Sequence, residues 1–320
     1  MADQLTTGGW ILALVQTLLF AACAPLLSGW LKRVKCRLQN RRGPSVLQPY
    51  RDLVRVFRKE VVLADNATPL FRAVPYVVFG ATLLAASVLP LVAVRLPTAA
   101  IADAIVLVGF LALARMFLAL GAMDIGTAFG GMGASREMTV SSLAEPATLM
   151  AIFTLAMTAQ STNLSTVMQH LLADGIVLRP SFLFALLGLV LVAVAETGRV
   201  PVDNPATHLE LTMIHEAMLL EYSGRHLALL EWAAQIKLMV FGVLIANIFC
   251  PWGVATAFSP EALAQGVAAV AVKLALLALA LAVAETTLAK MRLFRVPHLL
   301  NLAFLLALLG MLSHVILETS

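Results

Sequence analysis

Residues 32–44 read KRVKCRLQNRRGP, and they separate the first long apolar block of the chain, residues 10–31, from the second, residues 70–94. The connection between these blocks, up to residue 60, holds ten of the 22 Lys and Arg residues. Lys and Arg accumulate in membrane-protein loops on the cytoplasmic side. We therefore expect a cytoplasmic loop between two membrane-spanning helices, on the face where a water-soluble partner can dock.

The composition excludes an ordinary soluble domain. Hydrophobic residues make up 61% of the 320 residues and charged residues 12%, which is too little polar surface for a soluble fold. The apolar blocks are about 20 residues long, as a membrane-crossing helix requires, whereas a transmembrane β-barrel alternates in segments of about 10. The sequence predicts an all-α polytopic membrane protein with about eight transmembrane helices, at residues 10–31, 70–94, 101–122, 138–159, 180–197, 227–249, 262–288 and 298–317.

No segment between these blocks is long enough to form a soluble domain with its own core. We expect a single transmembrane domain over residues 1–320, with a basic cytoplasmic loop at residues 32–69 and an acidic cytoplasmic loop with a short helix at residues 198–226. No Lys or Arg precedes the first block, so it differs from a cleaved signal peptide and is expected to stay in the membrane.

The distribution of positive charge predicts the orientation. With the N-terminus outside, the outer loops hold only Arg95 and Arg179. The inner loops then hold the opening cluster with Arg72, then Arg136, then Arg199 and Arg225, then Lys290, Arg292 and Arg295. The sequence therefore predicts an N-out, C-out topology.

Several charged residues fall inside or beside the apolar blocks. An ionisable group at the bilayer centre costs roughly 2.5–3.5 kcal/mol, so each needs a partner, water or a function. Arg115 and Glu285 are close enough to block ends to reach the interface, and Lys273 is expected to be an interhelical partner. The acidic residues gather in the predicted cytoplasmic half, which favours a hydrated, acid-lined cavity with exchangeable protons. The predicted proton path comprises Asp124, Glu145, Glu196, Asp203, Glu210, Glu216, Glu221, Lys237 and Glu285.

The loop after the fifth block predicts a short helix. Pro201 and Pro205 prevent a simple continuation of the preceding span. Thr207 and Glu210 fit a capping box, so a helix is expected to start near residue 208 and to end at Gly224.

This short helix has two interpretations. Its Leu and Met residues favour a position at the interface or folded back into the bundle, where His215 could sense pH. Alternatively it is an ordinary amphipathic surface helix, with Glu221 and Arg225 as an i,i+4 pair.

No metal site is expected in this chain. Cys23, Cys36 and Cys250 are scattered, without a Cys-x-x-Cys motif or a nearby His in ligand spacing. His208 and His215 are seven residues apart, which is not a metal spacing either. We predict no catalytic, cofactor-binding or metal-binding residue here.

Five motifs in order carry a resemblance to a known family. They are RRGP at residues 41–44, QPYRD at 48–52, GASRE at 133–137, AETGRVPVD at 195–203 and EYSG at 221–224. Together they resemble the respiratory complex I subunit 1 family, whose members are membrane proteins with eight spans. The resemblance covers nearly the whole chain.

Within that family the chain is similar to the hydrogenase-type branch, the membrane-anchor subunits of formate hydrogenlyase, hydrogenase-4 and related energy-converting [NiFe] hydrogenases. The loop after Gly43-Pro44 reaches Gln48 directly, and residues 133–137 are followed by LAEP at 143–146. The chain departs from formate hydrogenlyase at residues 204–216, where a Leu- and Met-rich segment replaces an acidic run.

The resemblance implies a non-catalytic subunit of an oxidoreductase complex in a bacterial or archaeal cytoplasmic membrane. Its implied partners are a [NiFe]-hydrogenase-like large subunit, a small iron–sulfur subunit, a ferredoxin-like iron–sulfur subunit, antiporter-like membrane subunits and lipid, and no nucleic acid is expected. The [NiFe] centre and the iron–sulfur clusters would lie in the partners. The resemblance places Glu145, Glu196 and Glu221 at the family's acidic positions.

We expect the chain to anchor the soluble arm and to couple electron transfer to proton movement through the acidic cavity. Arginine forks suit the carboxylates of a docked partner, although lipid contact and topology alone would also explain the first loop. The predicted interface comprises Arg41, Arg42, Gly43, Pro44, Gln48, Tyr50, Arg51, Asp52, Arg136, Glu137, Arg199 and Arg225.

Two alternatives stay open at this point. The chain could be the quinone-binding subunit of a complex I-type NADH-quinone oxidoreductase, with an apolar quinone chamber. It could also be a stand-alone secondary transporter, although broken helices in matched positions of two halves, typical of transporters, are not seen.

Overall fold

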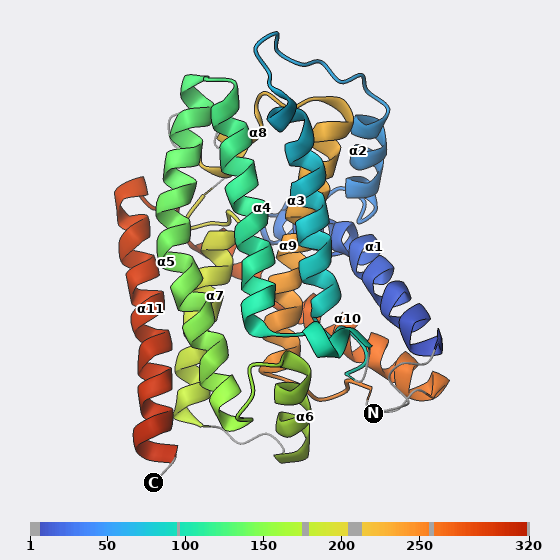
Figure 1. Cartoon of the computed structure of the whole chain (residues 1–320), viewed down its shortest axis with the longest axis vertical. Helices are drawn as coiled ribbons and strands as arrows, with labels where there is room; N and C mark the ends of the chain where they lie inside the picture. The colour runs from blue at the N-terminus through green and yellow to red at the C-terminus, as the bar shows by residue number, and fades with distance from the viewer. Residues whose placement is uncertain (1–6, 95–96, 175–178, 204–212, 256–258, 319–320) are drawn as a thin grey trace.

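The structure is a computed structural model, and it describes residues 7–94, 97–174, 179–203, 213–255 and 259–318. Helices make up most of it (Figure 1). Short connecting helices are α2 (Gln48–Phe57), α6 (Leu164–Asp174) and α8 (His215–Leu219), with further turns at Pro97–Ile101, Leu293–Arg295 and His314–Glu318. No β-strand occurs in these ranges. The long helices of Figure 1 are α1 (Thr7–Leu38), α3 (Pro69–Val88), α4 (Ala104–Asp124), α5 (Ala128–Thr158), α7 (Pro180–Glu196), α9 (Gly224–Ile248), α10 (Pro260–Thr287) and α11 (Val296–Ser313).

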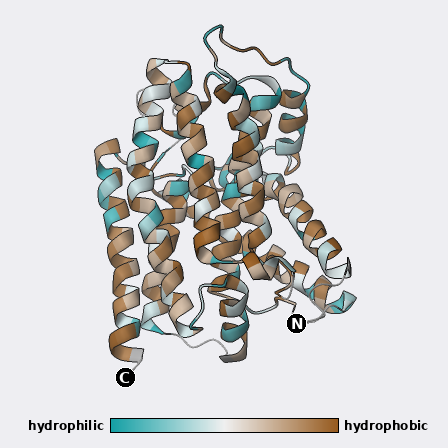
Figure 2. Cartoon of the chain, in the orientation of Figure 1, coloured by the Kyte–Doolittle hydropathy of each residue, from teal (hydrophilic) through white to brown (hydrophobic). Residues whose placement is uncertain are grey.

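Seven of the described helices are long and apolar enough to cross a membrane, and the predicted span at residues 180–197 corresponds to the apolar 17-residue helix α7. Figure 2 shows hydrophobic residues along most of the length of the bundle. The polytopic all-α membrane fold is thereby confirmed. The number of crossings and the orientation stay predictions. In Figure 1, α1 begins and α11 ends toward the same end of the bundle, as an even number of crossings requires.

Helix α9 lies at the centre of the bundle, where it contacts α1, α2, α3, α7 and α10. Its residues Ile236, Val240 and Leu244 are completely buried, so this helix contributes one apolar face to the largest hydrophobic core. A second group, α5, α7 and α11, packs beside it through small residues such as Ala147 and Ala303. Small side chains allow helices to approach closely in a membrane. Lys237 projects from α9, the helix at the centre of the bundle.

Two helices extend beyond their predicted bounds. α1 continues to Leu38, so the first cations of the basic segment lie on its last turns rather than in a loop. Positive charge is favourable there because the carbonyl end of a helix carries partial negative charge. α5 begins at Ala128, ten residues before the predicted start, so Arg136 and Glu137 are helical. The Thr127 hydroxyl caps this earlier start by accepting from the Gly130 N–H at 3.4 Å.

The predicted helix from residue 208 to Gly224 is wrong in its extent. Glu210 and the proposed start lie outside the described residues, and the described helix α8 covers only His215–Leu219. Gly224 begins α9 instead, with a φ of +53° that favours glycine. A Cβ at this position would lie 2.6 Å from the Glu60 carbonyl oxygen, so the approach of the 58–69 connection also requires a glycine.

Helix α8 folds back onto α5 rather than lying as a free surface helix. Ala217, Met218 and Leu219 are buried, and the contact is closest at Gly133. A Cβ at Gly133 would lie 3.0 Å from both the Ile214 carbonyl oxygen and the Ala217 Cβ. The first of the two predicted interpretations, a helix folded into the bundle, is therefore the observed one.

We predict that Gly133→Val displaces α8 and lowers the thermal unfolding midpoint of the purified protein, because overpacking typically costs about 1–3 kcal/mol. Gly131→Val is the matched control on the same helix, since a Cβ at Gly131 meets nothing within 4 Å. Thermal unfolding in detergent, followed by size-exclusion chromatography, measures both variants. Equal midpoints for the two would contradict the close contact.

Candidate functional site

Four charged side chains meet where α4, α5, α7 and α9 come together, and Glu145 is the most exposed of them, with 34% of its side chain accessible. The Arg115 Nη1 lies 2.8 Å from Glu196 Oε1, and the Lys237 Nζ lies 2.9 Å from Glu196 Oε2. Arg115 Nη1 also lies 3.4 Å from Glu145 Oε1. We call Arg115, Glu145, Glu196 and Lys237 the central charge cluster.

The local sequence explains how these charges become buried. Arg115 follows Leu111 and Ala114 on the buried face of α4, and Glu196 ends α7 directly after the buried Ala195. Arg115 is 5% exposed and Glu196 6%. An uncompensated buried charge is strongly destabilising, whereas a matched set offsets much of the desolvation. Two cations and two carboxylates give the cluster no net charge.

A second set of ion pairs joins α1, α10 and the segment after α7. Glu285 on α10 accepts from Lys35 at 2.9 Å and lies 3.4 Å from Arg199. Asp203 lies 3.1 Å from Lys290 and accepts from the Ile214 N–H at 3.1 Å. We call these residues, Lys35, Arg199, Asp203, Glu285 and Lys290, the α10 clamp. It fixes the two ends of the loop that leads from α7 to α8.

Two small cavities lie next to the central charge cluster. One contains Arg115 and Lys237 in its lining, and the other contains Glu196 and Asp203. Glu137 and His215 line both cavities. Burial lowers the pKa of His215, Lys237 lowers it further, and Glu216 and Asp203 oppose the shift. The imidazole is therefore neutral over a wider pH range than an exposed histidine.

Among the described residues, most members of the predicted proton path fall into the two sets of ion pairs. Glu145, Glu196 and Lys237 belong to the central charge cluster, and Asp203 and Glu285 belong to the α10 clamp. Each buried acid of these two sets pairs with a cation, which removes the repulsion expected from the sequence. Arg115 and Glu285, expected to reach the interface, are buried instead. Lys273 is an interhelical partner as expected, donating to the Cys250 carbonyl at 2.5 Å.

The other predicted acids lie apart from both sets. Asp124 accepts from the Thr68 N–H and hydroxyl at 3.0 and 2.8 Å, so it fixes the start of α3. Together with burial, Asp124 raises the pKa of Tyr222, whose ring stacks on Phe71. Glu216 and Glu221 are exposed, and Glu210 lies outside the described residues.

The predicted interface residues divide into exposed and inward-facing groups. Arg136 donates to the Met213 carbonyl at 2.9 Å, Arg199 contacts Glu285, and Glu137 is 7% exposed. Arg136 and Glu137 face inward because they lie on α5, and Arg199 faces inward through its contact with Glu285. On α2, Gln48 donates to Asp52, and Tyr50 donates to the Ala22 carbonyl. The predicted interface residues that are exposed are Arg41, Arg42, Pro44, Arg51 and Arg225, while Gly43 packs on Arg33.

Sequence reasoning missed the interior position of Glu137 and the pairing roles of Arg115, Lys35 and Lys290. One signal was available for Glu137. Buried positions recur along α5 at helical spacing, at Gly130, Gly133, Glu137, Val140 and Ala144. A single helix from residue 128 would have placed Glu137 on the inner face.

No metal site is apparent in the described ranges, where no three His, Cys, Asp or Glu side chains are arranged to hold an ion. Cys23, Cys36 and Cys250 are free thiols. The chemistry that this arrangement offers is charge compensation and proton binding.

Comparison with known proteins gives matches over nearly the whole chain. Residues 10–316 match the family described as NADH dehydrogenase. The chain is 34% identical over 300 residues to formate hydrogenlyase subunit 4 of Escherichia coli K12, covering 94% of this chain and 97% of the relative. Hydrogenase-4 component C of the same organism is also 34% identical over 300 residues, with 94% of each chain covered.

Two further proteins are more distant. An NADH-quinone oxidoreductase subunit of Thermomicrobium roseum is 27% identical over 244 residues, covering 68% of this chain and 70% of the relative. A chain in the structure of the membrane-bound sulfane sulfur reductase, an archaeal respiratory membrane complex, superposes with a TM-score of 0.82 at 19% identity, covering 95% of this chain and 99% of that one. This last likeness concerns the fold.

We predict that Glu196→Gln lowers the thermal unfolding midpoint strongly, because it leaves the largely enclosed Lys237 ammonium without a carboxylate and Arg115 with Glu145 alone, and breaking a buried ion pair typically costs about 3–5 kcal/mol. The double variant Glu196→Gln with Lys237→Gln keeps the Arg115–Glu145 pair and restores charge balance, so it should recover most of the loss. The exposed Glu261→Gln on α10 is the matched control. A double variant less stable than the single one would contradict the proposed charge balance.

Proposed function

Because the chain belongs to the NADH dehydrogenase family, with its hydrogenase-type relatives matched over nearly their full length, we propose that it is the membrane subunit of a hydrogenase-like respiratory complex. It anchors a soluble electron-transfer arm and couples electron transfer there to proton movement within the bundle. The chain acts as one multi-pass transmembrane domain without a catalytic centre of its own.

The relatives support this assignment over the alternatives. The hydrogenase-type relatives are more similar to this chain than the complex I-type relative, at 34% against 27% identity, and cover more of it. Their names describe a subunit and a component of larger assemblies, which disfavours a stand-alone transporter.

The single observation that carries the coupling proposal is the central charge cluster. Buried ionisable groups inside a membrane protein usually mark ion or proton pathways, because structure alone rarely repays their cost. Glu196 holds two cations at 2.8 and 2.9 Å, and Thr197 to Asp203 connect it directly to the α10 clamp. A shift of residues 197–203 would therefore change the distances between Glu196 and its two cations.

The exposed arginines support a docking face at the end of the bundle that carries α2 and α8 (Figure 1). Arg41, Arg42 and Arg51 extend into solvent there, free to form forked contacts with partner carboxylates. We propose that the partner at this face is the [NiFe]-hydrogenase-like large subunit with iron–sulfur subunits beside it, and that antiporter-like membrane subunits pack against the bundle. The [NiFe] centre and the clusters belong to the arm.

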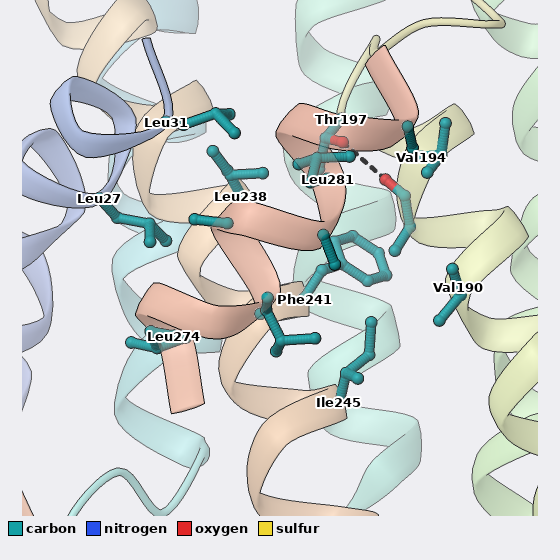
Figure 3. A pocket seen from close by; sticks show the side chains of 16 residues that line it. Leu27, Leu31, Val190, Val194, Thr197, Leu238, Phe241, Ile245, Leu274 and Leu281 are labelled. Atoms are coloured by element: carbon teal, nitrogen blue, oxygen red, sulfur yellow. Dashed lines mark hydrogen bonds between the residues drawn. The ribbon is translucent and has the colours of Figure 1, made fainter. Parts of the chain in front are cut away.

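A quinone-binding role is the second candidate, because an apolar pocket opens between α1, α7, α9 and α10 (Figure 3). Its lining includes Phe241 and several leucines, among them Leu27, Leu31, Leu238, Leu274 and Leu281. A quinone head group also needs polar partners, as ligand sites usually provide. The Thr197 hydroxyl in this pocket already donates to the Ala193 carbonyl at 2.6 Å, as Figure 3 shows. The pocket therefore suits an apolar chain better than a quinone head group.

We predict that Arg41→Ala with Arg42→Ala weakens the docked arm. Tagged wild-type chain, extracted in mild detergent, should bring down the soluble subunits with nickel and iron in fixed ratio. The double variant should retain the membrane subunits and lose most of the soluble ones, as quantified by mass spectrometry and metal analysis.

Arg179→Ala, at the opposite, predicted outer end, is the control and should leave the composition unchanged. Unchanged copurification in the double variant would remove these arginines from the interface. A wild-type chain recovered alone would contradict the proposed function. Quinone bound in stoichiometric amount, without nickel, would favour the second candidate.

A further inference from the structure

Glu137 differs from the other buried carboxylates of the described residues. Glu196, Asp203 and Glu285 each lie within 3.4 Å of at least one Lys or Arg nitrogen. Glu137 is 7% exposed, and it forms neither an ion pair nor a hydrogen bond with the described part of the chain. Burying a carboxylate without a partner is so costly that the group normally holds a proton instead.

The neighbouring charges do not change this conclusion. The positive charges of Lys237 and Arg115 attract the Glu137 carboxyl electrostatically, but both cations already pair with the carboxylates of the central charge cluster. Glu196 and Asp203 are the neighbouring negative groups. Since the cluster is neutral, an ionised Glu137 would add one uncompensated negative charge. A protonated Glu137 leaves the balance intact.

Helix packing brings a second proton-binding group to the same place. Gly133 and Glu137 lie one turn apart on α5, and the backbone of α8 approaches Gly133 to contact distance at Ile214. His215 is the next residue, and its Nε2 is buried without a hydrogen-bond partner among the described residues. Glu137 and His215 both line the two cavities beside Arg115–Lys237 and beside Glu196–Asp203.

We propose that Glu137 is the proton-carrying carboxyl of this protein, and that it exchanges its proton with the His215 imidazole. This proposal rests on the proposed function, which it deepens by naming the group that binds the transported proton. The next residue of α8, Glu216, is exposed, and α8 lies at the end of the bundle that carries the proposed docking face, so His215 would stand between the docked arm and the interior. The step transfers one proton from an O–H of Glu137 to a ring nitrogen of His215, or back, and no electron moves.

The position of His215 makes the exchange dependent on α8. α8 is five residues long and is held at one side by the Asp203 contact to the Ile214 N–H. A displacement of α8 by the docked arm would move the imidazole away from the two cavities that Glu137 lines and interrupt the exchange. When α8 is in place, a protonated His215 can return its proton to the Glu137 carboxylate that the first transfer leaves.

The test compares Glu137→Gln with Glu196→Gln and Glu261→Gln in the assembled complex. Infrared spectroscopy at neutral pH should show the carbonyl band of a protonated carboxylic acid, shifted in D₂O. Glu137→Gln should remove this band, and the other two should keep it. Glu137→Gln should leave the thermal unfolding midpoint near that of the wild type, because it replaces one neutral group by another. A persisting band, or a fall in stability as large as for Glu196→Gln, would overturn the proposal.

A second measurement addresses transport. Inverted vesicles supplied with reduced viologen should acidify or alkalinise their lumen, and Glu137→Gln should lower protons moved per electron at least about tenfold. Glu137→Asp, which keeps the carboxyl, should recover part of the loss, and His215→Gln should reproduce it. If the wild type moves protons and Glu137→Gln moves as many protons per electron, the role of Glu137 is wrong and the proposed function stands. A wild type that moves no protons would overturn the proposed function as well.

Discussion

Electrostatic compensation of Glu196 is the constraint on which the interior of this protein depends. One carboxylate at the end of α7 binds a guanidinium from α4 and an ammonium from α9, and Glu145 from α5 balances the remaining charge. α4, α7 and α9 are thereby positioned by groups that none of them could bury alone, and the partly exposed Glu145 ties α5 to them. The same requirement makes the cluster sensitive to changes in charge, because adding or removing one charge alters the free energy of burying the others.

The α10 clamp extends this sensitivity toward the proposed docking face. Lys35 lies on the last turns of α1, just before the exposed Arg41 and Arg42, and it shares Glu285 with Arg199. Arg199 is three residues from Glu196. Movement of the basic segment can therefore reach the central charge cluster through two ion pairs and a short stretch of backbone. Such a connection offers a physical route by which an arm bound outside the membrane could affect proton binding inside it.

The sequence predicts the fold well because membrane-spanning segments have a strong signature. The apolar blocks at residues 70–94 and 101–122 correspond to α3 and α4. Five ordered motifs indicate the family that the comparisons confirm. The ion pairs between buried side chains have no such signature in the sequence. Arg115 and Glu196 are 81 positions apart, and nothing in their local sequence indicates contact. The motif at residues 133–137 predicts a loop, and therefore a surface position for Glu137, whereas capping at Thr127 starts α5 earlier.

Proton movement through the central charge cluster is tested most directly in inverted membrane vesicles that contain the whole complex. Protons translocated per electron would be measured for the wild type and for the charge-balanced variant Glu196→Gln with Lys237→Gln, at equal amounts of assembled complex. We expect protonophore-sensitive translocation in the wild type and its loss in the variant, with electron transfer continuing. Full translocation by the variant would contradict the central role of Glu196.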